Sequence, residues 1–290
     1  QFREEAPAYF RIPGHRFERG LDEALNGASL AAYDLSEAEG LDDLHHAEGV
    51  IAEAQRLAAE TWKAKKTFFL VNGTTCGNEA MVLSSVKEGE KIIVPRNVHK
   101  SVLMGLILCG ATPVYVMPEY STKWQMWGGV TPETIEKAFA ETPDAKAVLL
   151  VSPTYYGLCS DLQAIAEICH CHNAALLVDE AHGSHLYFSE QLPLGALESG
   201  ADACAQSIHK TAGSFTQSSF LSLGSGRLDE ARVAANLQMV QSTSPSYLLM
   251  ASLDAARRGM ALHGKERMER ALELGQRERQ ELAKIKGIEV

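Results

Sequence analysis

The chain has 290 residues, 46% of them hydrophobic and 22% charged, which is the composition of an ordinary folded protein rather than a disordered one. A formal net charge of −10 without a run of Lys and Arg argues against nucleic acid as a partner. The apolar runs are too short to span a bilayer and the first residues lack a signal-peptide pattern, so neither a membrane protein nor a secreted one is expected.

The first part of the chain is expected to be an arm followed by a helix. Residues 1–46 are rich in acidic and turn-forming residues and show little periodicity, so we expect an N-terminal arm that wraps another surface. Apolar residues then recur at helical spacing from Val50 to Trp62, which predicts a helix within residues 47–66.

From Thr67 onwards, short apolar runs alternate with helical segments. Seven strands are predicted, at residues 68–71, 91–94, 112–117, 147–151, 175–179, 203–207 and 220–223. Five helices are predicted between them, at residues 78–86, 99–109, 131–140, 162–171 and 194–199. This alternation predicts an α/β fold with a mostly parallel seven-stranded sheet between helices.

The last part of the chain is predicted to be helical. Helices are expected at residues 227–241, 246–264 and 265–284. We therefore expect a major domain over residues 47–245, followed by a helical segment at 246–290 that leads to a C-terminal domain absent from this chain.

A polar turn follows the first predicted strand and opens a helix. It comprises Asn72-Gly73-Thr74-Thr75-Cys76-Gly77-Asn78-Glu79. Backbone N–H groups at such a helix start can bind an anion such as phosphate. The same residues also suit an ordinary turn between strand and helix, and the segment alone does not decide between the two.

Two further predicted strands are followed by, or end in, side chains that could take part in catalysis. Lys210 follows the run at 203–207, and Asp179 ends the run at 175–179. The carboxyl ends of parallel strands meet at one edge of a sheet, so the two side chains are expected to share a crevice. A lysine and a carboxylate placed in this way suit pyridoxal phosphate, with Lys210 forming a Schiff base and Asp179 pairing with the pyridine nitrogen. Taken alone, a lysine at a strand end is more often a solvated surface residue than a cofactor lysine.

Three other sequence patterns each allow a functional and a purely structural interpretation. His99 follows a strand and could stack on a planar cofactor or merely cap a helix. The segment from Asp179 to His182 spells a helicase box, but no phosphate-binding lysine loop precedes it. Cys169, His170, Cys171 and His172 lie on a predicted helix, where residues two apart point to different sides, so no metal site is predicted. The six scattered cysteines predict reduced thiols and a cytoplasmic protein.

Taken together, the motifs of the chain resemble one family, the Orn/Lys/Arg decarboxylases, and specifically the major domain of its short form without a receiver-like N-terminal domain. The matching residues are Pro13-Gly14-His15, Leu41-Asp42-Asp43-Leu44, Asn72-Gly73-Thr74-Thr75, Asn97-Val98-His99-Lys100-Ser101, Ser152-Pro153-Thr154-Tyr155-Tyr156-Gly157, Val178-Asp179-Glu180-Ala181-His182-Gly183, Ser207-Ile208-His209-Lys210-Thr211 and Ser242-Thr243-Ser244-Pro245-Ser246-Tyr247. The resemblance implies the fold-type-I, aspartate-aminotransferase-like architecture of pyridoxal phosphate enzymes.

The resemblance also implies roles for individual residues. Lys210, Asp179, His182 and His209 would be catalytic. The residues that would contact the cofactor are Thr74, Thr75, Cys76, His99, Asp179, His182, Ser207, His209 and Lys210. His99 would stack on the ring and His182 would flank it. His182, His209 and Lys210 are all candidates for returning a proton to the substrate Cα.

By the same resemblance, the expected reaction is decarboxylation of a basic amino acid, arginine first and then lysine or ornithine, to its amine and CO2. Two subunits of such enzymes complete each other's sites, so a homodimer or a higher homo-oligomer is expected. The alternatives are an aminotransferase or aldolase of the same fold, or a non-catalytic module that retained it.

Overall fold

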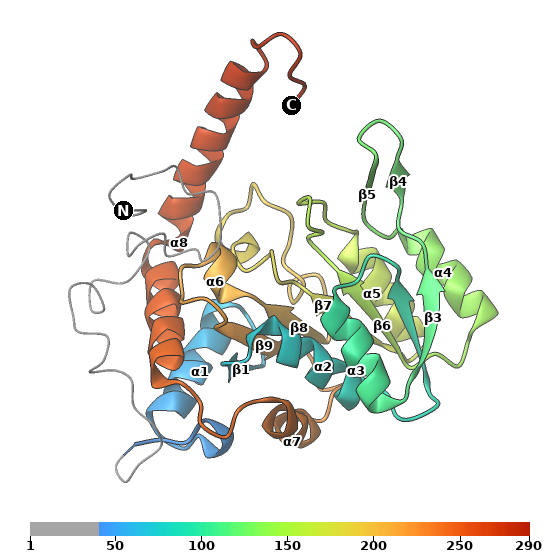
Figure 1. The fold of residues 1–290 in the computed structure, drawn as a ribbon, viewed down its shortest axis with the longest axis vertical. Coiled ribbons are helices and arrows are strands. Elements are labelled where there is room, and N and C mark those ends of the chain that lie inside the picture. Colours follow the sequence, from blue (N-terminus) through green and yellow to red (C-terminus); the bar gives the residue numbers. More distant parts are fainter. Residues whose placement is uncertain (1–40) are drawn as a thin grey trace.

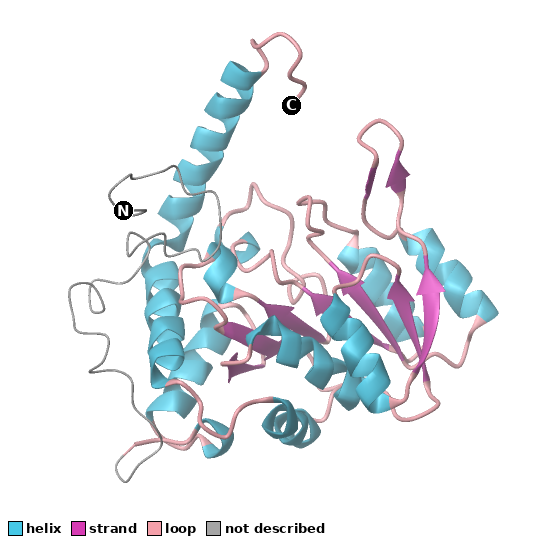
Figure 2. Cartoon of the chain, viewed as in Figure 1, coloured by secondary structure: helices cyan, strands magenta, loops and turns pink. Residues whose placement is uncertain are grey.

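The computed structural model describes residues 41–290, and most of the expected N-terminal arm therefore lies outside the described residues. A seven-stranded sheet forms the centre, with helices on both of its faces (Figure 2). Its strands, in the order in which they lie side by side, are β1 (Lys66–Leu70), β9 (Ser219–Leu223), β8 (Ala203–Gln206), β7 (Ala175–Asp179), β6 (Ala147–Val151), β2 (Lys91–Pro95) and β3 (Thr112–Val116). The seven predicted strands are thus confirmed.

Only β9 runs against its neighbours in this sheet. It pairs antiparallel with β1 and β8, whereas β8, β7, β6, β2 and β3 pair in parallel. Successive strands β6, β7 and β8 extend the sheet in one direction and β2 and β3 in the other. Open α/β sheets of this kind bind ligands outside the carboxyl ends of their strands.

The strands alternate their side chains between two apolar layers, as a fully buried parallel sheet requires. On β6, Val148 and Leu150 join one core cluster, while Ala147 and Leu149 join the other. The first cluster includes side chains from α1 (Val50–Thr61), α4 (Pro132–Glu141), α5 (Leu162–Cys171) and α8 (Tyr247–Leu282). The second includes side chains from α2 (Gly73–Ser85), α3 (Lys100–Cys109) and α7 (Glu230–Val240). The molecule is therefore a three-layer sandwich of helices, sheet and helices (Figure 1).

The helices around the sheet are α1 (Val50–Thr61), α2 (Gly73–Ser85), α3 (Lys100–Cys109), α4 (Pro132–Glu141), α5 (Leu162–Cys171), α6 (Ile208–Thr211), α7 (Glu230–Val240) and α8 (Tyr247–Leu282). Short 3-10 turns lie at η2 (Leu44–His46) and η3 (Leu186–Phe188), and β4 (Tyr120–Ser121) and β5 (Met126–Trp127) form a projecting hairpin. Among the described residues, no helix is both long enough and apolar enough to cross a membrane.

Two helix predictions were wrong. Residues 194–199 form turns, because the N–H groups of Ala196 and Leu197 donate to the side chains of Glu180 and Tyr187. The expected break after Gly264 is also absent, since α8 continues through it. A Cβ at Gly264 would lie 2.4 Å from the ring of Phe188, so this glycine permits close packing and does not end the helix.

The helix α2 begins five residues earlier than the predicted start at residue 78, directly after β1. Asn72 precedes it, and Gly73 adopts a φ of 75° in its first turn. Only Val71 and Asn72 separate β1 from α2, and this short connection brings the N-terminus of α2 to the carboxyl edge of the sheet.

Candidate active site

A cavity of about 810 Å³ lies at the carboxyl edge of the sheet. The parallel register places Val151, Asp179 and Ala205 side by side at the ends of β6, β7 and β8. The predicted site residues that line the cavity are Thr74, Thr75, His99, Asp179, His182, Ser207, His209 and Lys210. The structure therefore brings together the residues that the sequence pointed to, except Cys76.

Lys210 extends into this cavity from α6, a single helical turn that follows β8. Its Nζ lies 3.1 Å from Nε2 of His182. Burial lowers the pKa of Lys210, and the carboxylate of Asp179 acts against this effect. A lowered pKa leaves more of the free amine at neutral pH, which is the nucleophilic form.

Asp179 ends β7 and is only 3% exposed. Its Oδ1 accepts from the N–H of Ala181 at 3.2 Å, and its Oδ2 accepts from Nδ2 of Asn78 at 2.8 Å. Burial raises the pKa of Asp179, and the hydrogen bond from Asn78 is the main opposing contribution. A buried carboxylate is costly without a cationic partner, so the arrangement favours a ligand that presents a positive charge here.

The first turn of α2 supplies the polar end of the cavity. Thr74 donates to Ser219 at 3.1 Å, and its Oγ1 lies 2.5 Å from Oγ of Ser207, so hydroxyls connect α2 to the strand ends. Thr75 is exposed at the rim. The first N–H groups of a helix have no acceptor within it and favour an anion. This end of the cavity can therefore bind a phosphate.

Cys76 does not line the cavity. Its thiol donates to the carbonyl of Gly73, at 3.1 Å, and burial raises the pKa of the thiol to about 12. The sulfur is thus a protonated, inward-facing group that contributes to the turn of α2 and not to the cavity.

Three histidines line the cavity from different elements. His99 caps α3 and contacts Ser101. Burial, with Lys210 as the next cause, lowers the pKa of His182 to about 4, and the His182 ring also makes an edge contact with Tyr155. His209 donates from Nδ1 to the carbonyl of Ser218, and burial lowers the pKa of its ring. His182 is consequently uncharged at neutral pH, and its Nε2 can accept a hydrogen bond from Nζ of Lys210.

Sequence reasoning missed several residues of the site. Asn78 is four residues beyond Thr74, so helical spacing places both on one face of α2, and that signal was available. Tyr155, Thr216 and Gln217 also line the cavity. Gln217 has a φ of 83° in the loop before β9, and no local sequence pattern predicts that its side chain would line the cavity.

The Cys-His run of α5 is not gathered around one point. His170 bonds Asp202, His172 stacks on Phe139, Cys169 is buried and Cys171 is exposed. These four side chains therefore point to different sides, as the helical spacing predicts.

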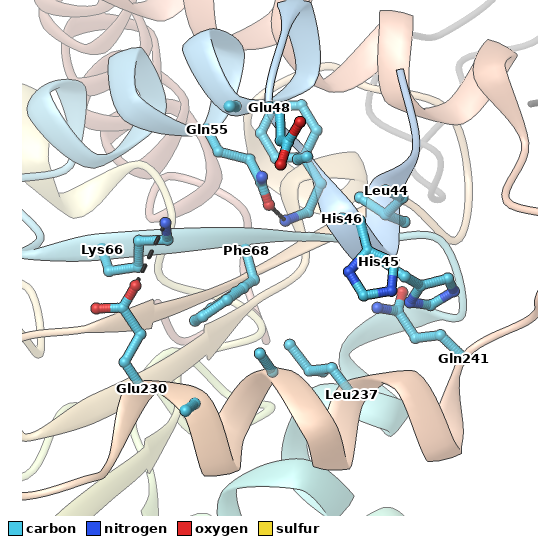
Figure 3. A pocket seen from close by; sticks show the side chains of 15 residues that line it. Leu44, His45, His46, Glu48, Gln55, Lys66, Phe68, Glu230, Leu237 and Gln241 are labelled. Carbon is cyan, nitrogen blue, oxygen red and sulfur yellow. Dashed lines mark hydrogen bonds and ion pairs between the residues drawn. The ribbon is translucent and has the colours of Figure 1, made fainter. Parts of the chain in front are cut away.

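A second pocket, of about 470 Å³, lies beside the edge strand β1, between η2, α1 and α7 (Figure 3). Gln55 and Gln241 enter it from α1 and from the residue after α7, and Lys66 pairs with Glu230 at its rim. None of the predicted site residues lines this pocket.

The chain was compared with known proteins. It is 45% identical to an arginine decarboxylase of Halalkalibacterium halodurans over 285 residues, covering 97% of this chain and 58% of that protein. It is 43% identical to an arginine decarboxylase of Bacillus subtilis over the same length and with the same shares. The chain thus spans little more than half the length of the curated relatives it matches.

Solved structures share the fold. A lysine decarboxylase A from Pseudomonas aeruginosa superposes with a TM-score of 0.77 at 26% identity, over 97% of this chain and 42% of that one. A serine palmitoyltransferase of Sphingomonas wittichii, at 18% identity, superposes with a TM-score of 0.65 over 91% of this chain and 59% of that one, and shows the fold alone. These neighbours are fold-type-I enzymes, in agreement with the predicted architecture. The family model described as Orn/Lys/Arg decarboxylase, major domain, matches residues 1–290. The chain therefore belongs to the Orn/Lys/Arg decarboxylase family, and the matched part is the family's major domain.

Proposed function

We propose that this chain is the cofactor-binding part of a pyridoxal-phosphate-dependent decarboxylase of basic amino acids, with arginine as the first substrate and lysine or ornithine next. The observation that carries the proposal is the convergence of Lys210 and Asp179 on one cavity at the carboxyl edge of the sheet. Relatives named arginine decarboxylase, at 45% and 43% identity, support the choice of substrate.

The residues of the cavity fit pyridoxal phosphate. The helix start at Thr74 and Thr75 suits a phosphate, and His99 offers a flat ring. Each oxygen of Asp179 has one donor, from Ala181 or Asn78, and thus retains acceptor capacity for a protonated ring nitrogen. When bound, pyridoxal phosphate supplies a ring that accepts the electrons left as CO2 departs from the amino acid.

The chain's own residues would then act on the substrate and its protons. Lys210, with its lowered pKa, would bind the cofactor aldehyde and later release the product amine. Asp179 would keep a proton on the ring nitrogen, and burial makes that charge pairing stronger than it would be in water. His182, His209 and Lys210 all line the cavity and remain candidates for the proton that returns to Cα.

Borohydride reduction of the protein with bound pyridoxal phosphate tests the assignment of the lysine. Peptide mapping should find the label on Lys210. Lys100 also lines the cavity, so Lys100→Ala is the matched control and should retain the label. Label on Lys100 in the parent protein would contradict the proposal.

The reaction class and substrate need a second measurement. Incubation with arginine, lysine and ornithine should release CO2 and the corresponding amine, fastest with arginine. Formation of a keto acid without CO2 would favour an aminotransferase. Cofactor binding with no turnover of any of the three, in a protein of the relatives' full length, would favour a non-catalytic module.

We also propose a cytoplasmic homodimer in which residues 47–245 bind the cofactor and 246–290 lead to a further domain. The six free thiols support a reducing compartment. Side chains such as Ile107 and Leu108, 79% and 61% exposed on α3, support an apolar interface on this helix. Sedimentation over a dilution series should show a dimer. A monomer at all micromolar concentrations, with cofactor bound, would contradict it.

A further inference from the structure

A chain of hydrogen bonds connects two cavity residues that are far apart in sequence. Nδ2 of Asn78 donates to Oδ2 of Asp179 at 2.8 Å and to Oγ of Ser101 at 2.9 Å. Oγ of Ser101 in turn lies 2.8 Å from Nδ1 of His99. The four residues come from α2, β7 and the start of α3, and α2 and α3 lie side by side in front of the sheet (Figure 1).

The chemistry of the groups fixes the direction of every bond in this chain. The carboxylate of Asp179 can only accept when it is ionised, so the amide of Asn78 must turn its NH2 group towards it. Both N–H bonds of that group are then used, one on Asp179 and one on Ser101. Nδ1 of His99 also accepts from the backbone N–H of Ser101 at 3.3 Å. The hydroxyl of Ser101 therefore donates to Nδ1, which leaves the ring proton of His99 on Nε2.

The chain of bonds is buried, which gives it rigidity. Asn78 is 1% exposed and Ser101 is fully buried. Oδ1 of Asn78 has no partner among the described residues, so the amide is oriented for the benefit of its NH2 group alone. A buried, unpartnered acceptor is unfavourable by itself. The protein retains this arrangement although it satisfies only half of the amide, and both ends of the chain of bonds line the cavity.

We propose that Asn78 is a positioning residue that holds Asp179 and, through Ser101, His99 as one unit, the carboxylate facing the ring nitrogen of the cofactor and the imidazole facing the ring. This inference rests on the proposed function. Asn78 sets the orientation of the carboxylate by donating to its Oδ2, while Ser101 sets the tautomer of His99. Burial raises the pKa of Asp179, and the hydrogen bond from Asn78 is the main contribution that opposes this rise.

The test compares two buried asparagines on the same layer of helices. Asn78→Ala removes both donors of the chain of bonds. Asn236→Ala is the matched control, because Asn236 is also buried and donates from Nδ2 to a serine, Ser84 at the far end of α2, but does not reach the cavity. Both variants should lower the unfolding midpoint of the cofactor-free protein. Only Asn78→Ala should weaken equilibrium binding of pyridoxal phosphate, by about tenfold or more, as expected for a lost hydrogen bond to a charged group.

A double-mutant cycle locates the effect. In an Asp179→Asn background, Asn78→Ala should change cofactor binding by less than about threefold, because the charge that Asn78 serves is gone. The visible absorbance of the bound cofactor should change in Asn78→Ala and stay unchanged in Asn236→Ala. An equal loss of binding with and without Asp179, or the same loss in the Asn236 variant, would overturn the inference.

Ser101→Ala is the second variant, and it decides the matter if Asn78→Ala does not fold. It should weaken cofactor binding a few-fold in the parent and leave it unchanged in a His99→Ala background. The same loss in both backgrounds would overturn the inference. Failure of the proposed function is distinguishable, because the parent protein itself would then bind no pyridoxal phosphate and Lys210 would carry no borohydride label.

Discussion

The cavity at the carboxyl edge and the pocket of Figure 3 use their polar side chains in opposite ways. In the pocket of Figure 3, Oε1 of Gln55 accepts from the N–H of Phe69 and Oε1 of Gln241 accepts from the N–H of Val71, both at 2.9 Å. These donors lie along the outer side of the edge strand β1, so the glutamines close an edge that would otherwise be open to another strand. The polar groups of this pocket are needed by the fold.

The cavity at the carboxyl edge is different. Four titratable groups that line it have shifted pKa values: the pKa of Asp179 is raised and those of His182, His209 and Lys210 are lowered, each chiefly by burial. Such groups destabilise the fold and are typical of functional sites. The polar groups of the pocket in Figure 3 satisfy backbone donors, whereas those of the cavity carry shifted pKa values, and this difference favours the cavity as the functional site.

The largest effect should come from Asp179→Asn. The fold should persist, because the amide replaces a buried carboxylate of the same shape, but decarboxylation should fall by more than a hundredfold. Loss of one charged hydrogen bond at a buried site, about 1.5–3 kcal/mol, already corresponds to about ten- to hundredfold, and loss of the ring proton adds to it. Rates of CO2 release and circular dichroism measure the two outcomes. Activity within twofold of the parent would show that the cavity does not depend on this charge.

A smaller effect, on stability alone, is expected from Gln55→Leu in the other pocket. The substitution leaves the buried N–H of Phe69 without an acceptor, which should lower the free energy of unfolding by about 1–3 kcal/mol. Gln55→Glu retains an acceptor oxygen and is the control for side-chain size. Denaturant titration measures both variants. The affinity for pyridoxal phosphate should stay the same, and a tenfold loss in the folded variant would mean that the two regions are coupled.

The pH dependence of stability should also reveal the shifted pKa values of the cavity at the carboxyl edge. The pKa of His182 falls from its usual 6.5 to about 4 on folding. Between these values the unfolded chain binds more protons than the folded one, so the free energy of unfolding should fall as the pH is lowered from 6.5 to 4. His182→Gln removes this contribution and should make the pH dependence of the cofactor-free protein shallower.

A control variant and the other titratable groups with shifted pKa values decide how that experiment is interpreted. His263→Gln, on an exposed position of α8, should leave the pH dependence of the parent unchanged. His185 and His209 also have lowered pKa values and act with His182, whereas Asp179 and Glu180 have raised values and act against it. The informative quantity is therefore the difference in pH dependence between the parent and His182→Gln. The same slope of unfolding free energy against pH in both proteins would contradict a lowered pKa of His182.

The same contrast explains how much the sequence could predict. The runs that form β6 and β7 are apolar on both faces, so they predict a buried parallel sheet. Asp179 ends one such run and Lys210 follows another, so their position at the carboxyl edge could also be predicted. The partner of Asp179 is Asn78, 101 positions away, and the contact exists only once α2 has packed on the sheet. The turn at residues 194–199 was mistaken for a helix for a similar reason, since the buried carboxylate of Glu180 takes its N–H group at Ala196. Local pattern predicts elements, while these polar contacts depend on tertiary packing.

The smallest effect should come from Lys66→Gln at the rim of the pocket in Figure 3. Lys66 and Glu230 lie 3.4 Å apart, and their side chains are 41% and 53% exposed. An ion pair so open to water contributes about 0–1 kcal/mol and is screened by salt. The free energy of unfolding should therefore fall by less than about 1 kcal/mol at low salt, and the difference should vanish at high salt. Glu230→Gln should give the same small loss, and the double variant should give no more than either single one. A larger loss that persists at high salt would mean that Lys66 acts through packing on Phe68, over whose ring its Nζ lies at 5.6 Å, and that the rim of this pocket contributes to the core and not only to the surface.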